Sequence, residues 1–85
     1  MFYVYVLKSI KVGKFYIGFT ENLKRRILEH KTGQVKSTRN WLPLELVYYE
    51  AYKSKKDALI RERRLKHFKN GYKELRKRIV NSVEL

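Results

Sequence analysis

Runs of apolar residues along the chain predict three β-strands. The first run, residues 2–7 (FYVYVL), is almost wholly aromatic or β-branched, which predicts a strand buried on both faces. A second run, residues 15–19, follows a short turn that contains Gly13, so the two strands should pair as an antiparallel hairpin. Residues 44–52 alternate in polarity and predict a third strand.

The segments between and after these strands have helical composition. The first predicted helix covers residues 21–32, with Thr20 as its N-cap and Gly33 after its last turn. A polar loop over residues 34–43 follows it.

Two more helices are predicted, over residues 55–69 and 72–80, with Asn70 and Gly71 between them. The element order is then β-β-α-β-α-α. This order predicts an α/β (α+β) fold in which a small three-stranded antiparallel sheet is flanked by three helices, in one domain over residues 1–85.

The charge balance points to a polyanionic partner. The 85 residues include 21 Lys and Arg against 8 Asp and Glu, a formal charge of +13, and such self-repulsion weakens a compact protein that has no anion to bind. Nucleic acid is the first candidate. A membrane is the poorer one, because the run over residues 2–7 is too short to span a bilayer or to form a signal peptide. The absence of cysteine excludes disulfides and thiolate zinc sites, and we expect a cytoplasmic protein.

The basic residues gather in three clusters, on the first helix, in the loop and along residues 53–78. Solvent-exposed helix faces explain part of this excess of basic residues. The scarcity of acidic residues nevertheless favours a surface that binds along a phosphate backbone. Candidate nucleic-acid contacts are Lys24, Arg25, Lys36, Arg39, Arg63 and Lys66. Trp41, beside this loop cluster, could stack on a base or close the core as a lid, and the sequence leaves both open.

Two residues of the first helix lie on an unexpected face. Leu23 and Ile27 mark the inward stripe, and His30 projects about 20° from Leu23 while Arg26 projects about 60° from it. Arg26 and His30 are four residues apart and therefore neighbours. A snorkelling arginine and a boundary histidine would explain them without any function.

A carboxylate lies within the apolar stripe of the second helix. That stripe consists of Ala58, Leu59 and Leu65. Glu62 projects about 40° from Ala58, and burying a charge without a partner is costly. It therefore needs a counter-charge, a metal or a raised pKa. An ion pair with Lys66 or with Arg26 is the plain interpretation, and a divalent cation is the functional one.

Two tyrosines of the predicted hairpin complete a recognisable constellation. Tyr5 and Tyr16 would ordinarily serve cross-strand packing. In the order Tyr3-Val4-Tyr5, Tyr16-Ile17-Gly18, Arg26, His30 and Glu62, however, the chain resembles the GIY-YIG nuclease superfamily over residues 2–80. More narrowly, it resembles the small stand-alone bacterial members related to the nuclease domain of the bacterial excision-repair enzyme.

The resemblance implies a role for each residue of the constellation. Tyr5 and Tyr16 would line the active site, one of them helping to deprotonate the attacking water. Arg26 would hold the scissile phosphate, and His30 matches the His or Tyr found one helical turn later. Glu62 would be the single protein ligand of one divalent metal ion, Mg²⁺ or alternatively Mn²⁺.

The implied activity is metal-dependent hydrolysis of phosphodiester bonds in DNA by an endonuclease related to DNA repair enzymes. Two departures from the family pattern are Tyr3, where the motif has Gly, and Phe19, where some repair relatives have Lys. A non-catalytic module that binds DNA or RNA with the same fold is the alternative, and an RNA-directed or ribosome-associated role is a third. The substrate structure, a recruiting protein and a homodimer are left open.

Overall fold

The computed structural model describes residues 1–67 and 69–83, and the side chains of 1–67 and 73–83. Its elements follow the predicted order, with a short turn of 3₁₀ helix and a short terminal helix added. They are β1 (Phe2–Ser9), β2 (Phe15–Thr20), α1 (Leu23–Lys31), η1 (Arg39–Trp41), β3 (Leu44–Tyr52), α2 (Lys55–His67), α3 (Lys69–Arg78) and α4 (Val80–Val83). The predicted α+β fold is confirmed.

The three strands form an antiparallel sheet in the order β2-β1-β3. The central strand is covered on both faces, as its composition predicts. Val4 and Val6 face one side and Tyr5 and Leu7 the other, and all four are at most 1% exposed. The order places β2 at one edge of the sheet.

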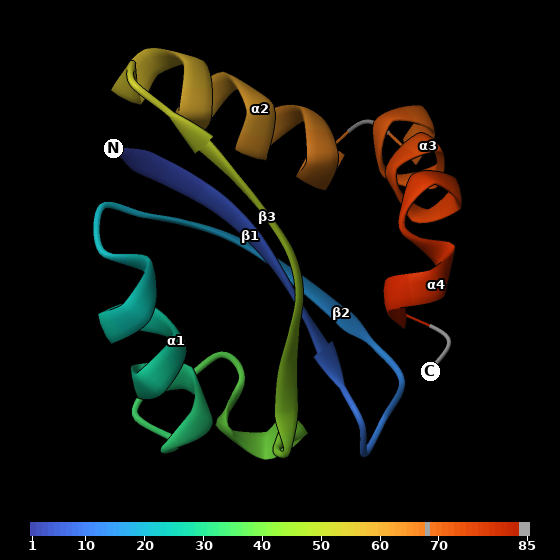
Figure 1. Cartoon of the computed structure of the whole chain (residues 1–85). Helices are drawn as coiled ribbons and strands as arrows, with labels where there is room; N and C mark the ends of the chain where they lie inside the picture. Colours follow the sequence, from blue (N-terminus) through green and yellow to red (C-terminus); the bar gives the residue numbers. More distant parts are fainter. Residues whose placement is uncertain (68, 84–85) are drawn as a thin grey trace.

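The helices cover the two faces of the sheet unequally. In Figure 1, α1 lies on one side of the strands while α2, α3 and α4 lie on the other. The core under α2 and α3 contains Val4, Val6, Ala58, Leu65 and Leu75. The core on the α1 side centres on Tyr5, Leu7 and Leu44, with Leu23 and Ile27 packed against it. The inward stripe predicted for α1 therefore lies where its spacing placed it.

The start of α1 differs from the prediction. Its N-cap is Asn22, whose side-chain oxygen accepts a hydrogen bond from the Arg25 amide at 3.0 Å. Thr20 instead ends β2, and its hydroxyl accepts from the Asn22 amide. Both residue types cap helices well, so composition alone could not choose between them. At the other end, Gly33 adopts φ +77° just after the helix, as predicted.

The break between the last long helices also differs from the prediction. α2 ends at His67, and α3 already begins at Lys69, so Asn70 and Gly71 lie in the first turn of α3 rather than between the helices. The first four amides of a helix have no intrahelical acceptor, which makes a first-turn glycine less costly than an interior one. Leu59, predicted in the inward stripe of α2, is 38% exposed, whereas Ala58 and Leu65 are buried.

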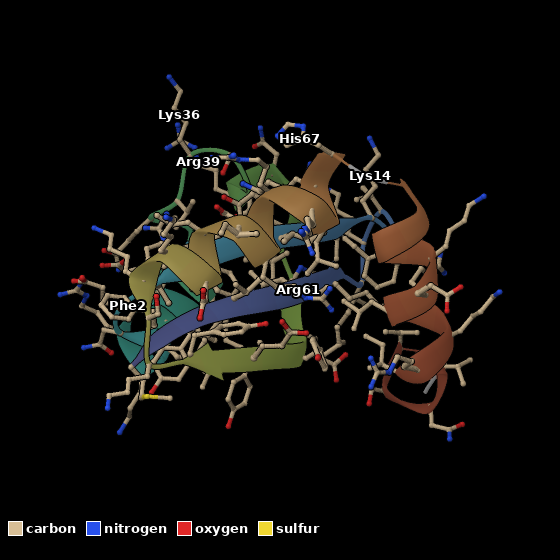
Figure 2. The ribbon with its side chains drawn as sticks, turned by 90° about the horizontal axis from the view of Figure 1, so that it is seen from above. Phe2, Lys14, Lys36, Arg39, Arg61 and His67 are labelled. Atoms are coloured by element: carbon tan, nitrogen blue, oxygen red, sulfur yellow. The ribbon has the colours of Figure 1, made fainter. Side chains whose placement is uncertain are left out.

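A polar network fixes α2 on the sheet. The Glu50 carboxylate of β3 accepts two hydrogen bonds from the Arg61 guanidinium, at 2.8 and 2.9 Å. It also accepts hydrogen bonds from the hydroxyls of Tyr48 and Tyr52. Figure 2 shows Arg61 directed from α2 into the interior of the molecule. The network therefore joins α2 to β3. No helix in the described part of the chain is long and apolar enough to cross a membrane.

Candidate nuclease site

The site begins where Tyr5 crosses the edge strand at Gly18. These residues are paired in the β1–β2 ladder, and Leu7 pairs with Tyr16 two residues along. A Cβ atom at Gly18 would lie 2.3 Å from both Cζ and the hydroxyl oxygen of Tyr5. Only glycine therefore lets the tyrosine ring lie flat over β2 with its hydroxyl at the sheet edge.

A buried chain of hydrogen bonds starts at this hydroxyl. The Tyr5 oxygen is 2.8 Å from Nε2 of His30, and Nδ1 of His30 is 2.8 Å from the Thr38 hydroxyl oxygen. His30 and Thr38 have no exposed surface, and Tyr5 is 1% exposed. Both ring nitrogens of the histidine are thus satisfied inside the protein.

Burial keeps the Tyr5–His30 pair uncharged. It lowers the pKa of the His30 imidazole to about 4, and the nearby Arg26 charge acts in the same direction. It raises the pKa of the Tyr5 hydroxyl to about 12, although Arg26 opposes that shift. At neutral pH the pair therefore consists of a phenol and a neutral imidazole.

Tyr16 closes one side of this cluster. Its ring centroid is 5.1 Å from that of His30 and 6.4 Å from that of Tyr5, and the Tyr5 and His30 centroids are 5.5 Å apart. The three rings thus pack against one another, with Tyr16 half-buried at the edge strand.

Arg26 supplies the positive charge beside the cluster. Its side chain is 36% exposed, and one guanidinium nitrogen donates to Glu29 at 3.1 Å. The Tyr5 hydroxyl, as a hydrogen-bonding partner, raises the pKa of the Arg26 guanidinium. Glu29 is half-buried against Arg26. A partly exposed guanidinium with two planar donor edges suits a phosphate.

Glu62 reaches the same edge from α2. Its side chain is only 19% exposed, and the Lys66 ammonium lies 3.1 Å from its carboxylate. This is the ion pair that the sequence offered as the plain interpretation of Glu62. The same ammonium lies 5.9 Å from the centre of the Tyr16 ring, and the Glu62 charge contributes to the raised pKa of Tyr5. The Lys66 ammonium therefore links the Glu62 carboxylate to the Tyr16 ring.

The donor set suits one kind of metal site. Within the described residues, no three His, Cys, Asp or Glu side chains are grouped to hold an ion. Mg²⁺ retains several waters and is commonly bound by one or two carboxylates together with substrate phosphates. A lone, partly covered Glu62 fits that pattern, whereas it does not fit a zinc or calcium cage.

The six predicted nucleic-acid contacts are all exposed but occupy different places. In the view of Figure 2, Lys36 and Arg39 lie with Lys14 and His67 along the margin of the molecule that carries β2. Lys66 adjoins Tyr16, and Arg63 lies exposed on α2. On α1, Arg25 pairs with Glu29 at 3.9 Å, and Lys24 lines a separate groove of 490 Å³ between α1 and β3. Lys24 thus lies apart from the tyrosine cluster.

One feature of the site, the burial of Thr38, was not found from the sequence. Thr38 was only one of several polar residues in the predicted loop, and nothing in its spacing showed that it would be buried under His30.

Trp41 packs half-buried against the core around Tyr5, with the Lys14 ammonium 5.7 Å from its ring centre. Trp41 therefore covers this core, which is one of the two roles that the sequence left open.

Fold and site together define a class of small α+β domains with a tyrosine-bearing hairpin, a basic residue on the next helix and a carboxylate on a later one. The GIY-YIG catalytic domain model matches residues 1–78, and the chain belongs to this family.

More particular similarities are to UPF0213 proteins. The chain is 40% identical over 73 residues to a UPF0213 protein of Streptococcus pneumoniae, covering 85% of this chain and 73% of the relative. It is 42% identical over 73 residues to one of Natronomonas pharaonis, covering 85% of each. The solution NMR structure of the UPF0213 protein BH0048 from Bacillus halodurans is 39% identical, with a TM-score of 0.55, over 88% of this chain and 81% of that one.

Proposed function

We propose that the protein is a divalent-metal-dependent endonuclease that hydrolyses phosphodiester bonds in DNA. The observations that support the proposal are the neutral Tyr5–His30 pair, the Arg26 guanidinium beside it, and the Glu62 carboxylate that Lys66 links to Tyr16. Membership of the GIY-YIG family supports a nucleic-acid substrate.

The Tyr5–His30 pair suits proton transfer from the attacking water. A phenol with a pKa of about 12 stays protonated at neutral pH, so Tyr5 can accept a proton only by giving up its own. Nε2 of the neutral His30 is 2.8 Å away and receives that proton. Nδ1–H keeps its hydrogen bond to Thr38, so Tyr5 stays neutral and the positive charge lies on the His30 imidazolium, which the low pKa of His30 makes short-lived.

Arg26 suits the phosphoryl group. Its guanidinium, beside the Tyr5 hydroxyl, would hold two non-bridging oxygens and neutralise charge as the water adds. Glu62 is the residue that would hold the divalent ion, which supplies further charge neutralisation and stabilises the leaving oxygen.

A second candidate function is a non-catalytic nucleic-acid-binding module. The observation that favours it is the Lys66–Glu62 ion pair, in which the lysine neutralises the carboxylate proposed as the metal ligand. Such a module would need only the basic surface of the fold.

A substrate panel distinguishes these two functions. Single-stranded, duplex, flap and branched DNA, with matching RNA, are incubated with Mg²⁺ or Mn²⁺, and cleavage and binding are measured in parallel. The proposal expects metal-dependent cleavage of at least one DNA structure. Salt-sensitive binding without cleavage of any substrate would favour the module, and cleavage confined to RNA would replace the proposed substrate.

A further inference from the structure

The ion pair between Lys66 and Glu62 differs from the other helical ion pairs of the molecule. Its carboxylate is 19% exposed, against 31% for Glu29 and 72% for Glu74 in their pairs. The glutamate precedes the lysine by four residues on α2, which is the favourable orientation for such a pair.

The lysine is held by a second partner on the sheet. Its ammonium lies 5.9 Å from the centre of the Tyr16 ring, near enough for a cation–π interaction. The lysine side chain is 41% exposed, so its ammonium reaches solvent while it lies between a carboxylate on α2 and an aromatic face on β2.

A lysine in this position conflicts with a metal ion at Glu62. A divalent ion binds carboxylate oxygens at about 2.0–2.1 Å, and an ammonium 3.1 Å from the same carboxylate would face it at close range. The repulsion between charges of +2 and +1 at such separation is substantial even in water. The metal ion and the ammonium therefore cannot both bind the Glu62 carboxylate tightly at the same time.

We propose that Lys66 is an internal counter-ion of the metal ligand, which neutralises Glu62 in the free protein and is displaced when a divalent ion binds there. This inference rests on the proposed function, because it takes Glu62 as the metal ligand. Once displaced, the ammonium remains beside Tyr16, where the scissile phosphate would lie, and a phosphate replaces the carboxylate as its partner. Lys66 is thus a positioning residue that makes metal binding in the absence of nucleic acid weak.

The test measures Mn²⁺ binding without nucleic acid, by the loss of the free-ion signal in electron paramagnetic resonance. Lys66→Met keeps most of the length of the side chain and removes its charge, and we expect its affinity for Mn²⁺ to be about tenfold tighter than that of the wild type. Lys56→Met is the matched control, because it removes one charge from an exposed position of the same helix. Its affinity should stay within about twofold of the wild type.

The outcomes separate this inference from the proposed function. If Glu62→Gln weakens Mn²⁺ binding but Lys66→Met does not tighten it beyond the Lys56→Met control, Lys66 is no counter-ion and Glu62 remains a ligand. If Glu62→Gln binds Mn²⁺ like the wild type, both the metal site and the counter-ion are wrong.

A measurement on the wild-type protein covers the case in which Lys66→Met does not fold. Lysine side-chain NMR signals are followed during a titration with diamagnetic Mg²⁺. The Lys66 ammonium signal should move as the ion binds, while that of Lys56 should not. A Lys66 signal that stays unchanged at saturating Mg²⁺ would overturn the inference.

Discussion

At the scale of single residues, buried hydrogen bonds decide which side chains form the site. His30 projected toward the inner face of its helix, and the spacing offered a histidine at the boundary of the core, whereas the structure buries it completely. Its two partners did not follow, because Tyr5 lies 25 residues before it and Thr38 lies eight residues after it in a loop. Contacts of this kind depend on how the loop packs, which helical periodicity does not determine.

The neutral His30 predicts that acid destabilises the fold. Its pKa is about 4 in the folded protein, below the ordinary value of 6.5, so between these values the unfolded chain binds a proton that the folded one does not. The free energy of unfolding should therefore fall by about 2 kcal/mol between pH 7.5 and pH 5.0 through this residue. Urea denaturation at the two pH values measures it.

The matched variant for this prediction is His30→Gln, which keeps polar atoms but does not titrate in this range. Its unfolding free energy should change less between the two pH values than that of the wild type. Equal pH dependence in both proteins would show that His30 is not the group responsible.

At the scale of elements, patterning located the strands well and the helix ends less well. The third strand, residues 44–52, was predicted with its observed bounds because alternation ends where the turn begins. The start of α1 was misplaced by two residues because Thr20 and Asn22 both suit an N-cap. The network around Glu50 was not predicted, since a strand pattern does not show which helix will cover an acid.

Glu50 should determine how firmly α2 is held. Glu50→Gln keeps the shape but removes the charge that accepts two hydrogen bonds from Arg61. We expect the unfolding free energy to fall by about 2 kcal/mol, because hydrogen bonds to charged groups contribute more than neutral ones. Urea denaturation measures the loss.

The control for that variant is Glu45→Gln, an exposed acid on the same strand. It should change the free energy of unfolding by less than about 0.5 kcal/mol. A Glu50→Gln protein as stable as this control would show that the network does not hold the helix.

At the scale of the whole molecule, the charge of +13 divides between a basic margin and scattered surface groups. Lys36 and Arg39 lie along the margin that carries β2 in the view of Figure 2, while Lys24 and Lys77 lie on other elements. The sequence predicted the attraction to phosphates but could not show which basic residues share a side with Tyr16. That grouping depends on how the loop, the hairpin and α2 pack together.

If Lys36 and Arg39 contact DNA phosphates, each should contribute to the salt dependence of DNA binding. Each phosphate contact removed should lower the slope of log affinity against log salt by about 1. Lys36→Ala and Arg39→Ala should each do so, and Lys77→Ala on α3 should not. Fluorescence anisotropy of a labelled duplex at several salt concentrations measures the slopes. Equal slopes for all three variants would place DNA elsewhere on the surface.

The central claim is that the β2 edge is a metal-dependent site for phosphodiester hydrolysis, with Glu62 as the metal ligand. The most direct measurement is the single-turnover rate of DNA cleavage with Mg²⁺ by the wild type and by Glu62→Ala, with the exposed Glu74→Ala as control. We expect Glu62→Ala to lower the rate by about a hundredfold or more, as EDTA does, while DNA binding persists and Glu74→Ala cleaves normally. Cleavage that continues unchanged in Glu62→Ala and in EDTA would contradict the account.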